Sequence, residues 1–522
     1  MILKYRKVFI KLSIALTLLL AVIILLFLAD YFIEKKMKDA IQNLQGSFSS
    51  LNINLFSRSV KIEELTWISK ESTEDSASHT LYVDLIKLKG IHLLPLIFDK
   101  RVIVNHLEID SANLSFIKNI RFSNDSSSQK SLKGFLIKQI SLKRIALRVK
   151  EDTTDVLSGI LNADIRQLRF ERDSTQKFVP SFSQITCTVK SIALNHKGGL
   201  YKTNIYKVYL NSEQQLISFD SIQLLPKHAK YDFAWKAGKQ VARLTLSIPK
   251  VDVINLDYDH LLQKQFIASA IRIQSFNLDV FKDKRVPFSQ TAHIHLPMHY
   301  FNALKWKVKI DSLAFGLSQI RTETFPESGI APAIITFDDV SGLLLNLDNI
   351  QEKEAIDYAT LQASGFFMGK GRIEATFQLP QDSSPVYHTK GFIKDMDMTI
   401  LNGALQNIAN INLKSGYLDL MNFNFTYTDF GSRGSLDMAY QSLSISSLNK
   451  NKSSTNEIKT ALLYLLVQRN KEIEPNLSGR VGTIDVKRDR KKHIFNIWLI
   501  SILDGMRSSF LGGDKVDNQS KK

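Results

Sequence analysis

The stretch "VIVNHLEIDSANLSFIK", from Val102 to Lys118, alternates between apolar and polar residues up to Ile109 and then loses the alternation for one position. The alternation resumes at Leu114 and Phe116. Successive side chains of a β-strand point to opposite faces, so this odd step would turn the second half of the stretch to the wrong face. An extra residue in a β-bulge restores the apolar face, and a tight bend between two short strands would do the same. The sequence therefore predicts a bulge or corner at "IDSAN".

The same stepped pattern, apolar-x-apolar-x-x-apolar-x-apolar, recurs along the chain. Its copies are Leu107, Ile109, Ala112, Leu114; Ile140, Leu142, Ile145, Leu147; Ile271, Ile273, Phe276, Leu278; Val308, Ile310, Leu313, Phe315; and, more loosely, Ile411, Leu413, Gly416, Leu418. Chance is the alternative, because apolar-x-apolar is common in any β-protein. The number of copies favours a repeated architecture.

The chain has 522 residues, which is too long for one compact core and favours about two to four domains or one elongated body. Strand-like segments of period two follow one another, with turns rich in Asn, Asp, Ser and Gly. We predict a mainly β fold, with an N-terminal transmembrane helix, an elongated, twisted antiparallel β-sheet body, and helices near the C-terminus. The body would be a repeating β-groove or a tandem β-sandwich.

An uncharged, mostly apolar run, "LSIALTLLLAVIILLFLA", extends from Leu12 to Ala29. As a helix it is long enough to cross the hydrocarbon layer of a membrane. Lys4, Arg6, Lys7 and Lys11 precede it, so the positive-inside rule places the N-terminus in the cytoplasm. A cleavable signal peptide is the alternative, but "LADYFIEKK" has no good cleavage site. We expect an uncleaved anchor.

Two segments near the C-terminus have helical patterns. "SSTNEIKTALLYLLVQRNKE" has Ser454 and Glu457 at capping-box spacing. "HIFNIWLISILDGMRSSFLGG" begins at His493 and ends at Gly512 and Gly513, which are typical of a helix end. Its apolar part is too short to span a bilayer, so it would lie at a membrane surface or cover the sheet. Burial against the sheet is the favoured interpretation.

No set of residues with catalytic spacing emerges, so we expect a protein that is not an enzyme. "TAHIHLPMHY" places His293 and His295 on one face of a possible strand, followed by His299, and such imidazoles could bind a divalent metal. However, Pro297 breaks the strand and no acidic residue is adjacent, which favours polar surface histidines. We expect no metal and no cofactor. Cys187 is the only cysteine and excludes an intramolecular disulfide.

The formal charge of +17 would suit either nucleic acid or an anionic membrane surface. Lysines and arginines are spread along the whole chain, and no known nucleic-acid-binding motif is present. Together with the anchor, this favours attraction to lipid headgroups and no nucleic-acid partner. The candidate membrane-surface residues are Lys487, Arg488, Arg490, Lys491, Lys492 and Trp498.

These parts resemble a known group. The single anchor, the stepped β-segments, "ITFDDVSGLLLNL" (Ile335 to Leu347) and the region from Lys390 to Ile445, with "MTILN", "INLKSGYLDL" and "GSRGSLDMAY", look like the AsmA-like envelope proteins, which include the TamB-type proteins. Members are similar to bridge-like lipid transfer proteins, whose β-groove carries acyl chains. The resemblance implies a Gram-negative inner-membrane protein that is single-pass, with a cytoplasmic N-terminus and a periplasmic β-body.

Five regions are predicted along the chain. They are the cytoplasmic tip and transmembrane anchor, a first periplasmic β region, a middle β-repeat region, an AsmA-like C-terminal β region, and a helical C-terminal segment with a polar tail. Their bounds are residues 1–34, 35–130, 131–300, 301–450 and 451–522.

The expected function is to bind or conduct phospholipid or another amphiphile in an apolar β-groove, which would support outer-membrane maintenance. Membrane phospholipids and other envelope proteins are the expected partners. The alternative is a structural or assembly scaffold of the envelope that acts through protein–protein contacts. The residues expected to line the groove could equally fill a closed β-sandwich core. They are Val104, Leu107, Ile109, Leu114, Phe116, Ile140, Leu142, Ile271, Ile273, Leu278 and Val280.

Overall fold

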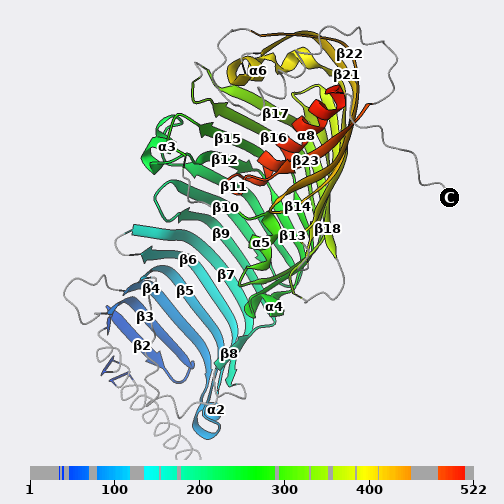
Figure 1. Ribbon diagram of the computed structural model, residues 1–522. Helices are drawn as coiled ribbons and strands as arrows, with labels where there is room; N and C mark the ends of the chain where they lie inside the picture. The colour runs from blue at the N-terminus through cyan, green and yellow to red at the C-terminus, as the bar shows by residue number, and fades with distance from the viewer. Residues whose placement is uncertain are drawn as a thin grey trace, which may run out of the picture. The chain divides into compact units, whose positions relative to one another are not determined.

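The structure is a computed structural model and is mainly β with few helices (Figure 1). It divides into two compact units: unit 1 comprises residues 1–197 and 204–214, and unit 2 comprises residues 198–203 and 215–522. The region boundaries predicted from the sequence stay predictions. The structure describes residues 34–35, 38–39, 46–69, 79–117, 134–151, 154–172, 178–288, 293–328, 331–350, 357–381, 385–409, 411–447 and 480–511.

Unit 1 is built on a sheet in which sequential strands are neighbours. Strands β1 and β2 both pair with β3, and β3, β4 and β5 follow antiparallel to one another. Strand β6 is parallel to β5, and β7 is antiparallel to both β6 and β9. The strands are β1 (Gly46–Ser47), β2 (Ser50–Asn54), β3 (Ser59–Ser69), β4 (His79–His92), β5 (Arg101–Ile117), β6 (Gly134–Glu151), β7 (Thr154–Arg172), β8 (Phe178–Ser181), β9 (Gln184–Asn195) and β10 (Tyr201–Asn211), with helix α2 (Leu93–Phe98) between β4 and β5.

One face of this sheet is apolar because the alternating residues of successive strands stand in register. Ile62, Ile86, Ile109 and Leu142 lie directly opposite one another across β3 to β6. The other face is charged, and there the Lys143 Nζ and a carboxylate oxygen of Glu108 are 2.8 Å apart. Unit 1 therefore has the two-faced sheet that the alternation predicts.

The step in the sequence pattern corresponds to a β-bulge in one of its two copies in unit 1. Ser111, in the middle of "IDSAN", and Arg144, at the same place in β6, both have left-handed backbone, with φ of 56° and 54°. The register between β6 and β7 shifts between Leu142 and Ile145, and the Arg144 N–H donates to the Asn162 side-chain oxygen at 2.7 Å. On β6 the extra residue is a β-bulge that returns the apolar side chains to one face, which confirms the bulge interpretation for this copy. On β5 the register with β4 and β6 does not shift across Ser111, so that copy has the left-handed residue without a bulge.

Unit 2 is also built from paired β-strands. Strand β11 pairs with both β12 and β13, β14 and β15 pair with these in turn, and β16 to β23 form an antiparallel series. Its strands are β11 (Leu216–Pro226), β12 (Ala242–Ile248), β13 (Val251–Leu256), β14 (Gln265–Ile273), β15 (Asn277–Asp283), β16 (Lys307–Phe325), β17 (Ala333–Asp348), β18 (Tyr358–Phe367), β19 (Gly371–Pro380), β20 (Tyr387–Asp397), β21 (Ile411–Tyr427), β22 (Gly431–Ser447) and β23 (Arg480–Lys487).

In unit 2 one copy of the stepped pattern forms a corner between two strands. The copy beginning at Val308 does not, because β16 pairs with β17 in one unshifted register from Lys309 to Phe315, so the predicted bulge or corner is wrong there. The copy beginning at Ile271 spans the gap between β14 and β15, where the Gln274 N–H donates to the Lys250 carbonyl at 3.0 Å. The adjacent strands carry left-handed residues at Leu317 and Asp339. Both outcomes predicted for the step, a bulge and a corner, therefore occur in this chain.

The expectation of an antiparallel sheet is wrong at two places. Strand β5 is parallel to β6, and both β14 and β15 are parallel to β16. The sequence did not reveal this because side chains alternate with the same period in parallel and antiparallel strands. The connecting segments, residues 118–133 and 284–306, are long enough for the return that a parallel pair requires.

The described helices are short, apart from one that covers the sheet of unit 2. Helix α8 (Ile494–Leu511) packs on β22 and β23, which confirms the helix predicted to precede Gly512 and its burial against the sheet (Figure 1). The others in unit 2 are α3 (Asp232–Ala237), α4 (Tyr258–Leu262), α5 (Pro297–Asn302), η2 (Met398–Leu401) and α6 (Asn402–Ala409).

No helix among the described residues is both long and apolar enough to cross a membrane. The predicted anchor, Leu12 to Ala29, lies outside the described residues, as does the predicted helix that contains Ser454 and Glu457.

Candidate functional site

The residues predicted to line a groove lie on the apolar faces of the two units. Val104 is opposite Ile91, which packs against the buried residues of β2 and β3. In unit 2, Leu278 is opposite Leu246 and Ile320. Each unit therefore holds part of the predicted set. Unit 1 carries Val104, Leu107, Ile109, Leu114, Phe116, Ile140 and Leu142, and unit 2 carries Ile271, Ile273, Leu278 and Val280.

Unit 2 contains a hollow that the sequence did not predict, on the apolar face of β16 to β21. Its floor is a row of four small residues, Gly342, Ala363, Ala375 and Gly391, which lie directly opposite one another on β17, β18, β19 and β20. The sequence neighbours of the floor residues also contribute to the lining of the hollow. The hollow has a volume of about 890 Å³, within the range of ligand sites. We name it the trough.

Aromatic rings form the two side walls of the trough. Phe315 on β16 is opposite Gly342, and Phe423 on β21 is opposite Gly391. A Cβ atom added to either glycine would overlap the ring beside it, so each ring leans over its glycine. From Phe315 to Phe423 the row therefore has a large side chain at each end and four small residues between them. The small residues leave a hollow on a face that larger side chains would otherwise fill.

The trough is suited to a ligand with an apolar body. Its floor and walls offer methyl groups, glycine backbone and two phenyl rings, which have no charge and no strong directional preference. Attraction for such a ligand is roughly proportional to the apolar area removed from water, at about 25 cal/mol per Å². Polar and charged residues that flank the floor, among them Glu374 and Lys390, also line the hollow and could meet the polar part of such a ligand.

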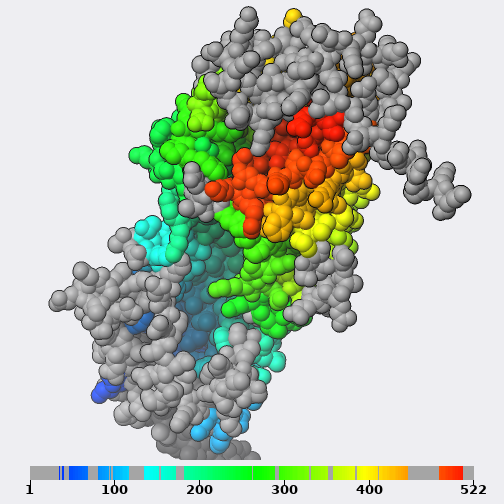
Figure 2. Space-filling model, viewed as in Figure 1, coloured from blue at the N-terminus to red at the C-terminus, as the bar shows by residue number. Residues whose placement is uncertain are grey.

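Helix α8 covers the same face next to the trough. Trp498 stacks on Phe377, two residues along β19 from the floor residue Ala375, with ring centres 4.7 Å apart. Its indole also meets the ring of Tyr427 edge-on at 6.3 Å. Burial raises the pKa of Tyr427 well above its ordinary value. In Figure 2, α8 (red) lies at the surface beside the strands coloured yellow to orange. Trp498 is thus half-buried against unit 2, and its assignment to a membrane surface stays a prediction.

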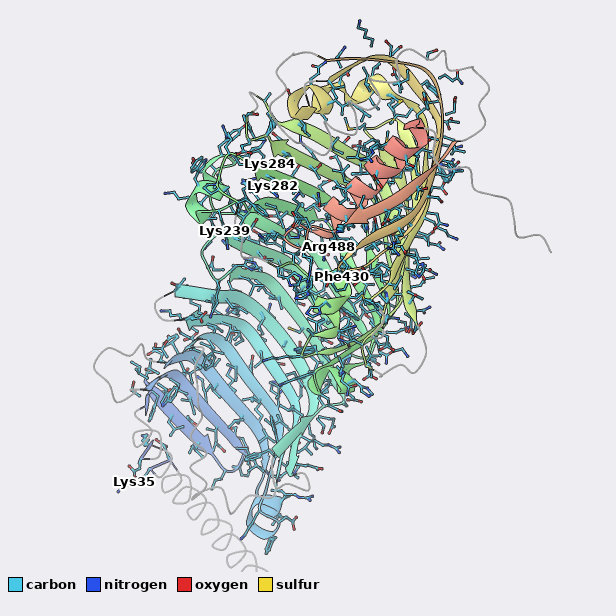
Figure 3. All side chains as sticks on the ribbon, in the orientation of Figure 1. Lys35, Lys239, Lys282, Lys284, Phe430 and Arg488 are labelled. Atoms are coloured by element: carbon cyan, nitrogen blue, oxygen red, sulfur yellow. The ribbon has the colours of Figure 1, made fainter. Side chains whose placement is uncertain are left out.

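Arg488 differs from the expectation that it is a membrane-surface residue. Its side chain is only 1% exposed and forms an ion pair with Asp429 in the turn between β21 and β22. It donates further hydrogen bonds to the carbonyl oxygens of Ile294, at 2.7 Å, and Lys492, at 3.3 Å. Figure 3 shows Arg488 beside Phe430, whose carbonyl accepts the Arg488 backbone N–H at 2.9 Å. Burial and pairing make this residue a structural link.

The other candidate membrane-surface residues are more accessible. Lys487, Arg490 and Lys491 are exposed and Lys492 is half-buried. Lys282, labelled in Figure 3 together with Lys284, lies in the same unit. Burial is the main cause that lowers the pKa of Lys282, and the charges of Lys284 and Lys492 lower it further. Lys282, Lys284 and Lys492 therefore concentrate positive charge in this part of unit 2.

The histidines of "TAHIHLPMHY" are only partly as predicted. Pro297 begins helix α5, so it does end the extended segment. His293 is exposed and His295 half-buried, and their ring centres are 4.3 Å apart. The sequence analysis missed the acidic partner: Asp429, far along the chain, has a carboxylate oxygen 3.6 Å from His295 Nδ1. Only the long-range pairing of strands reveals this proximity.

Comparisons with models of protein families, with curated proteins and with solved structures found no match for this chain.

Proposed function

We propose that this protein binds the acyl chains of a phospholipid or of a similar amphiphile on its apolar β-faces, with the trough of unit 2 as a principal binding site. The observation that carries the proposal is the row of Phe315, the four small floor residues and Phe423. A closed core would place large side chains at these positions to reach the usual packing density. Small residues between two aromatic rings instead leave room for a ligand.

The apolar face of unit 1 supports the same proposal. Its register rows contain aliphatic residues on every strand from β2 to β6, such as Ile53, Val60, Leu88 and Leu107. Such a face must be covered, because a large apolar patch in water is unfavourable. An acyl chain would cover it without requiring directional contacts.

The proposal includes the cell location expected from the sequence. The apolar run from Leu12 to Ala29 would anchor the protein in the inner membrane, and the resemblance to AsmA-like proteins would place the β-body in the periplasm. In that setting the protein would hold or conduct phospholipid without chemical change, and so support outer-membrane maintenance. Exposed cations such as Lys487 and Lys491 would favour anionic headgroups.

The test is to fill the trough and measure bound lipid. Ala363→Trp places an indole on the floor, whereas Phe366→Trp places the same indole at an exposed position on the opposite face of the same strand, outside the lining of the hollow. Both full-length variants and the wild type are purified in mild detergent, stripped of it, and examined by native mass spectrometry with lipid extraction. We expect phospholipid with the wild type and Phe366→Trp, and at least about a fivefold lower content with Ala363→Trp, which corresponds to about 1 kcal/mol.

Equal lipid content in the two folded variants would contradict the assignment of the trough. A folded wild-type chain that carries no lipid and cannot be loaded with it would contradict the function itself. Circular dichroism establishes that the variants retain their β-structure.

The scaffold alternative has one observation in its favour. Phe495 on α8 and Phe430 in the β21–β22 turn are 71% and 72% exposed. Exposed aromatic residues are enriched where proteins bind one another. Replacing both with serine would weaken envelope-protein contacts if the scaffold function holds, and would leave the lipid content unchanged if the trough alone binds lipid.

A further inference from the structure

Three possible metal ligands meet at one end of unit 2. His293 and His295 lie in the extended segment before α5, and Asp429 lies in the turn between β21 and β22. One ligand atom from each residue can be chosen so that all three lie within 4.8 Å of one another. The His295 Nδ1 and Asp429 Oδ2 atoms are 3.6 Å apart. Two ligands of a tetrahedral zinc ion, each at about 2.1 Å from it, are about 3.4 Å apart.

A buried residue holds the two segments together. The Arg488 guanidinium pairs with one carboxylate oxygen of Asp429, and this leaves the second oxygen toward His295. The same guanidinium donates to the Ile294 carbonyl, between the two histidines. A backbone hydrogen bond of 2.9 Å from the Ile294 N–H to the Arg490 carbonyl adds a further link. Hydrogen-bonded carboxylates that orient ligands are typical of metal sites.

Neighbouring aromatic rings fix the orientation of His295. The His299 ring stacks on it with centres 3.9 Å apart and planes inclined by 19°. The Tyr300 hydroxyl accepts the His295 backbone N–H at 3.2 Å. The His295 side chain therefore loses less rotamer freedom when it binds a metal ion.

We propose that His293, His295 and Asp429 bind one divalent first-row transition-metal ion, of which zinc fits the ligand set best. Two imidazoles and one carboxylate form a three-residue set with at least one position left for water or another ligand. The site lies apart from the floor and walls of the trough, and its existence does not depend on lipid binding.

Arg490 competes with the metal. Its Nε–H donates to His293 Nε2 at 2.7 Å, so the guanidinium occupies a lone pair that a metal would use. Arg490 is exposed and lies over the Phe430 ring at 5.6 Å, where it can remain after leaving His293. Metal binding must displace it. Removing this guanidinium should strengthen binding, because both a competing donor and a nearby positive charge are lost.

The test uses the full-length chain, purified in mild detergent without a polyhistidine tag and treated with EDTA. It is titrated with Co²⁺, followed by its visible absorption, and then with Zn²⁺ as competitor. We expect one equivalent to bind in the micromolar range or tighter. His293→Ala, a change at an exposed residue, should weaken binding at least about tenfold, as should Asp429→Asn. Arg490→Gln should strengthen it about threefold to tenfold.

His299→Phe is the matched control, because it keeps the ring stacked on His295 but removes the imidazole nitrogens. Its metal affinity should equal that of the wild type. No saturable binding by the wild type, or equal affinities for the wild type and His293→Ala, would overturn the proposal. If Asp429→Asn fails to fold, the exposed His293 still decides the outcome. The lipid content of His293→Ala should be unchanged, so this test is separate from that of the proposed function.

Discussion

In unit 1 the row of Ile62, Ile86, Ile109 and Leu142 fills the apolar face with branched side chains, whereas in unit 2 the row between Phe315 and Phe423 has only glycine and alanine. Both rows lie on strands whose side chains alternate between two faces. The comparison indicates that the backbone pattern creates an apolar face, while the size of the side chains on that face determines whether it has room for a ligand.

The two units also differ in what packs on their sheets. In unit 2, helix α8 covers β22 and β23 and places Ile497 and Ser501 in full burial. Among the described residues of unit 1 the only helix past residue 46 is the six-residue α2, which contacts β5. Unit 2 therefore combines a covered core with a trough beside it, and substitutions should have different effects in the two parts.

The largest expected effect compares a buried ion pair with an exposed one. Arg488→Met leaves Asp429 without its partner and should lower the free energy of unfolding of unit 2 by about 3 kcal/mol. In unit 1, Arg144 pairs with Asp110 but its side chain is 67% exposed, so Arg144→Met should cost less than about 1 kcal/mol. Hydrogen exchange measured by mass spectrometry reports each unit separately. Equal losses of unfolding free energy in Arg488→Met and Arg144→Met would contradict the claim that the buried ion pair matters more than the exposed one.

The next comparison is between a filled position and an open one. Ile145 is 5% exposed in unit 1, so Ile145→Ala should cost about 2–4 kcal/mol through lost burial and a cavity. Ala375→Leu adds a side chain to the trough and should cost less than about 1 kcal/mol, since overpacking is costly only where space is filled. Chemical denaturation measures both. A loss above about 2 kcal/mol for Ala375→Leu would mean that the trough is a closed core.

A smaller effect concerns the left-handed residues of the steps. Leu317 has φ of 44° and is 75% exposed, so Leu317→Gly should raise the stability of unit 2 by up to about 1 kcal/mol. Ser111→Gly in unit 1 should gain less, because the Ser111 hydroxyl accepts a hydrogen bond of 2.9 Å from Arg144 Nε. Thermal denaturation of both variants tests the ranking. If Leu317→Gly is less stable than the wild type, the claim that the left-handed backbone at Leu317 is strained is wrong.

The smallest expected effect is on acid stability. Hydrogen bonds from Arg285 lower the pKa of the fully buried Asp283 in unit 2 below its ordinary value. A lowered folded pKa contributes stability above the unfolded pKa of about 3.9, and this is lost as the pH falls through the folded pKa. Asp283→Asn should therefore flatten the decline of stability below about pH 4, as followed by denaturation at several pH values. If stability depends on pH in the same way in Asp283→Asn and in the wild type, the Asp283 carboxylate does not contribute to acid stability.

The sequence predicted the features that depend on local pattern. Alternation around Ile109 and Ile140 gives the apolar face, and the step at Arg144 gives the bulge, because both depend on neighbours in the chain. Alternation cannot distinguish parallel from antiparallel pairing, so the partnership of β5 with β6 was missed.

The trough and the metal ligands could not be predicted for a related reason. Gly342, Ala363 and Gly391 are unremarkable within their own strands, and only the register places them in one row. Asp429 likewise meets His295 only through the fold. Such coincidences between distant segments carry no local signal.

Photo-crosslinking tests the central claim most directly. The full-length chain is loaded with a phospholipid that carries a diazirine in its acyl chain, irradiated and digested, and the labelled residues are mapped by mass spectrometry. The account predicts labelling on the floor and walls of the trough, at residues such as Ala363, Ala375 and Phe423, and loss of this labelling in Ala363→Trp but not in Phe366→Trp. Labelling confined to the exposed aromatic residues Phe430 and Phe495, with the trough unlabelled, would contradict it.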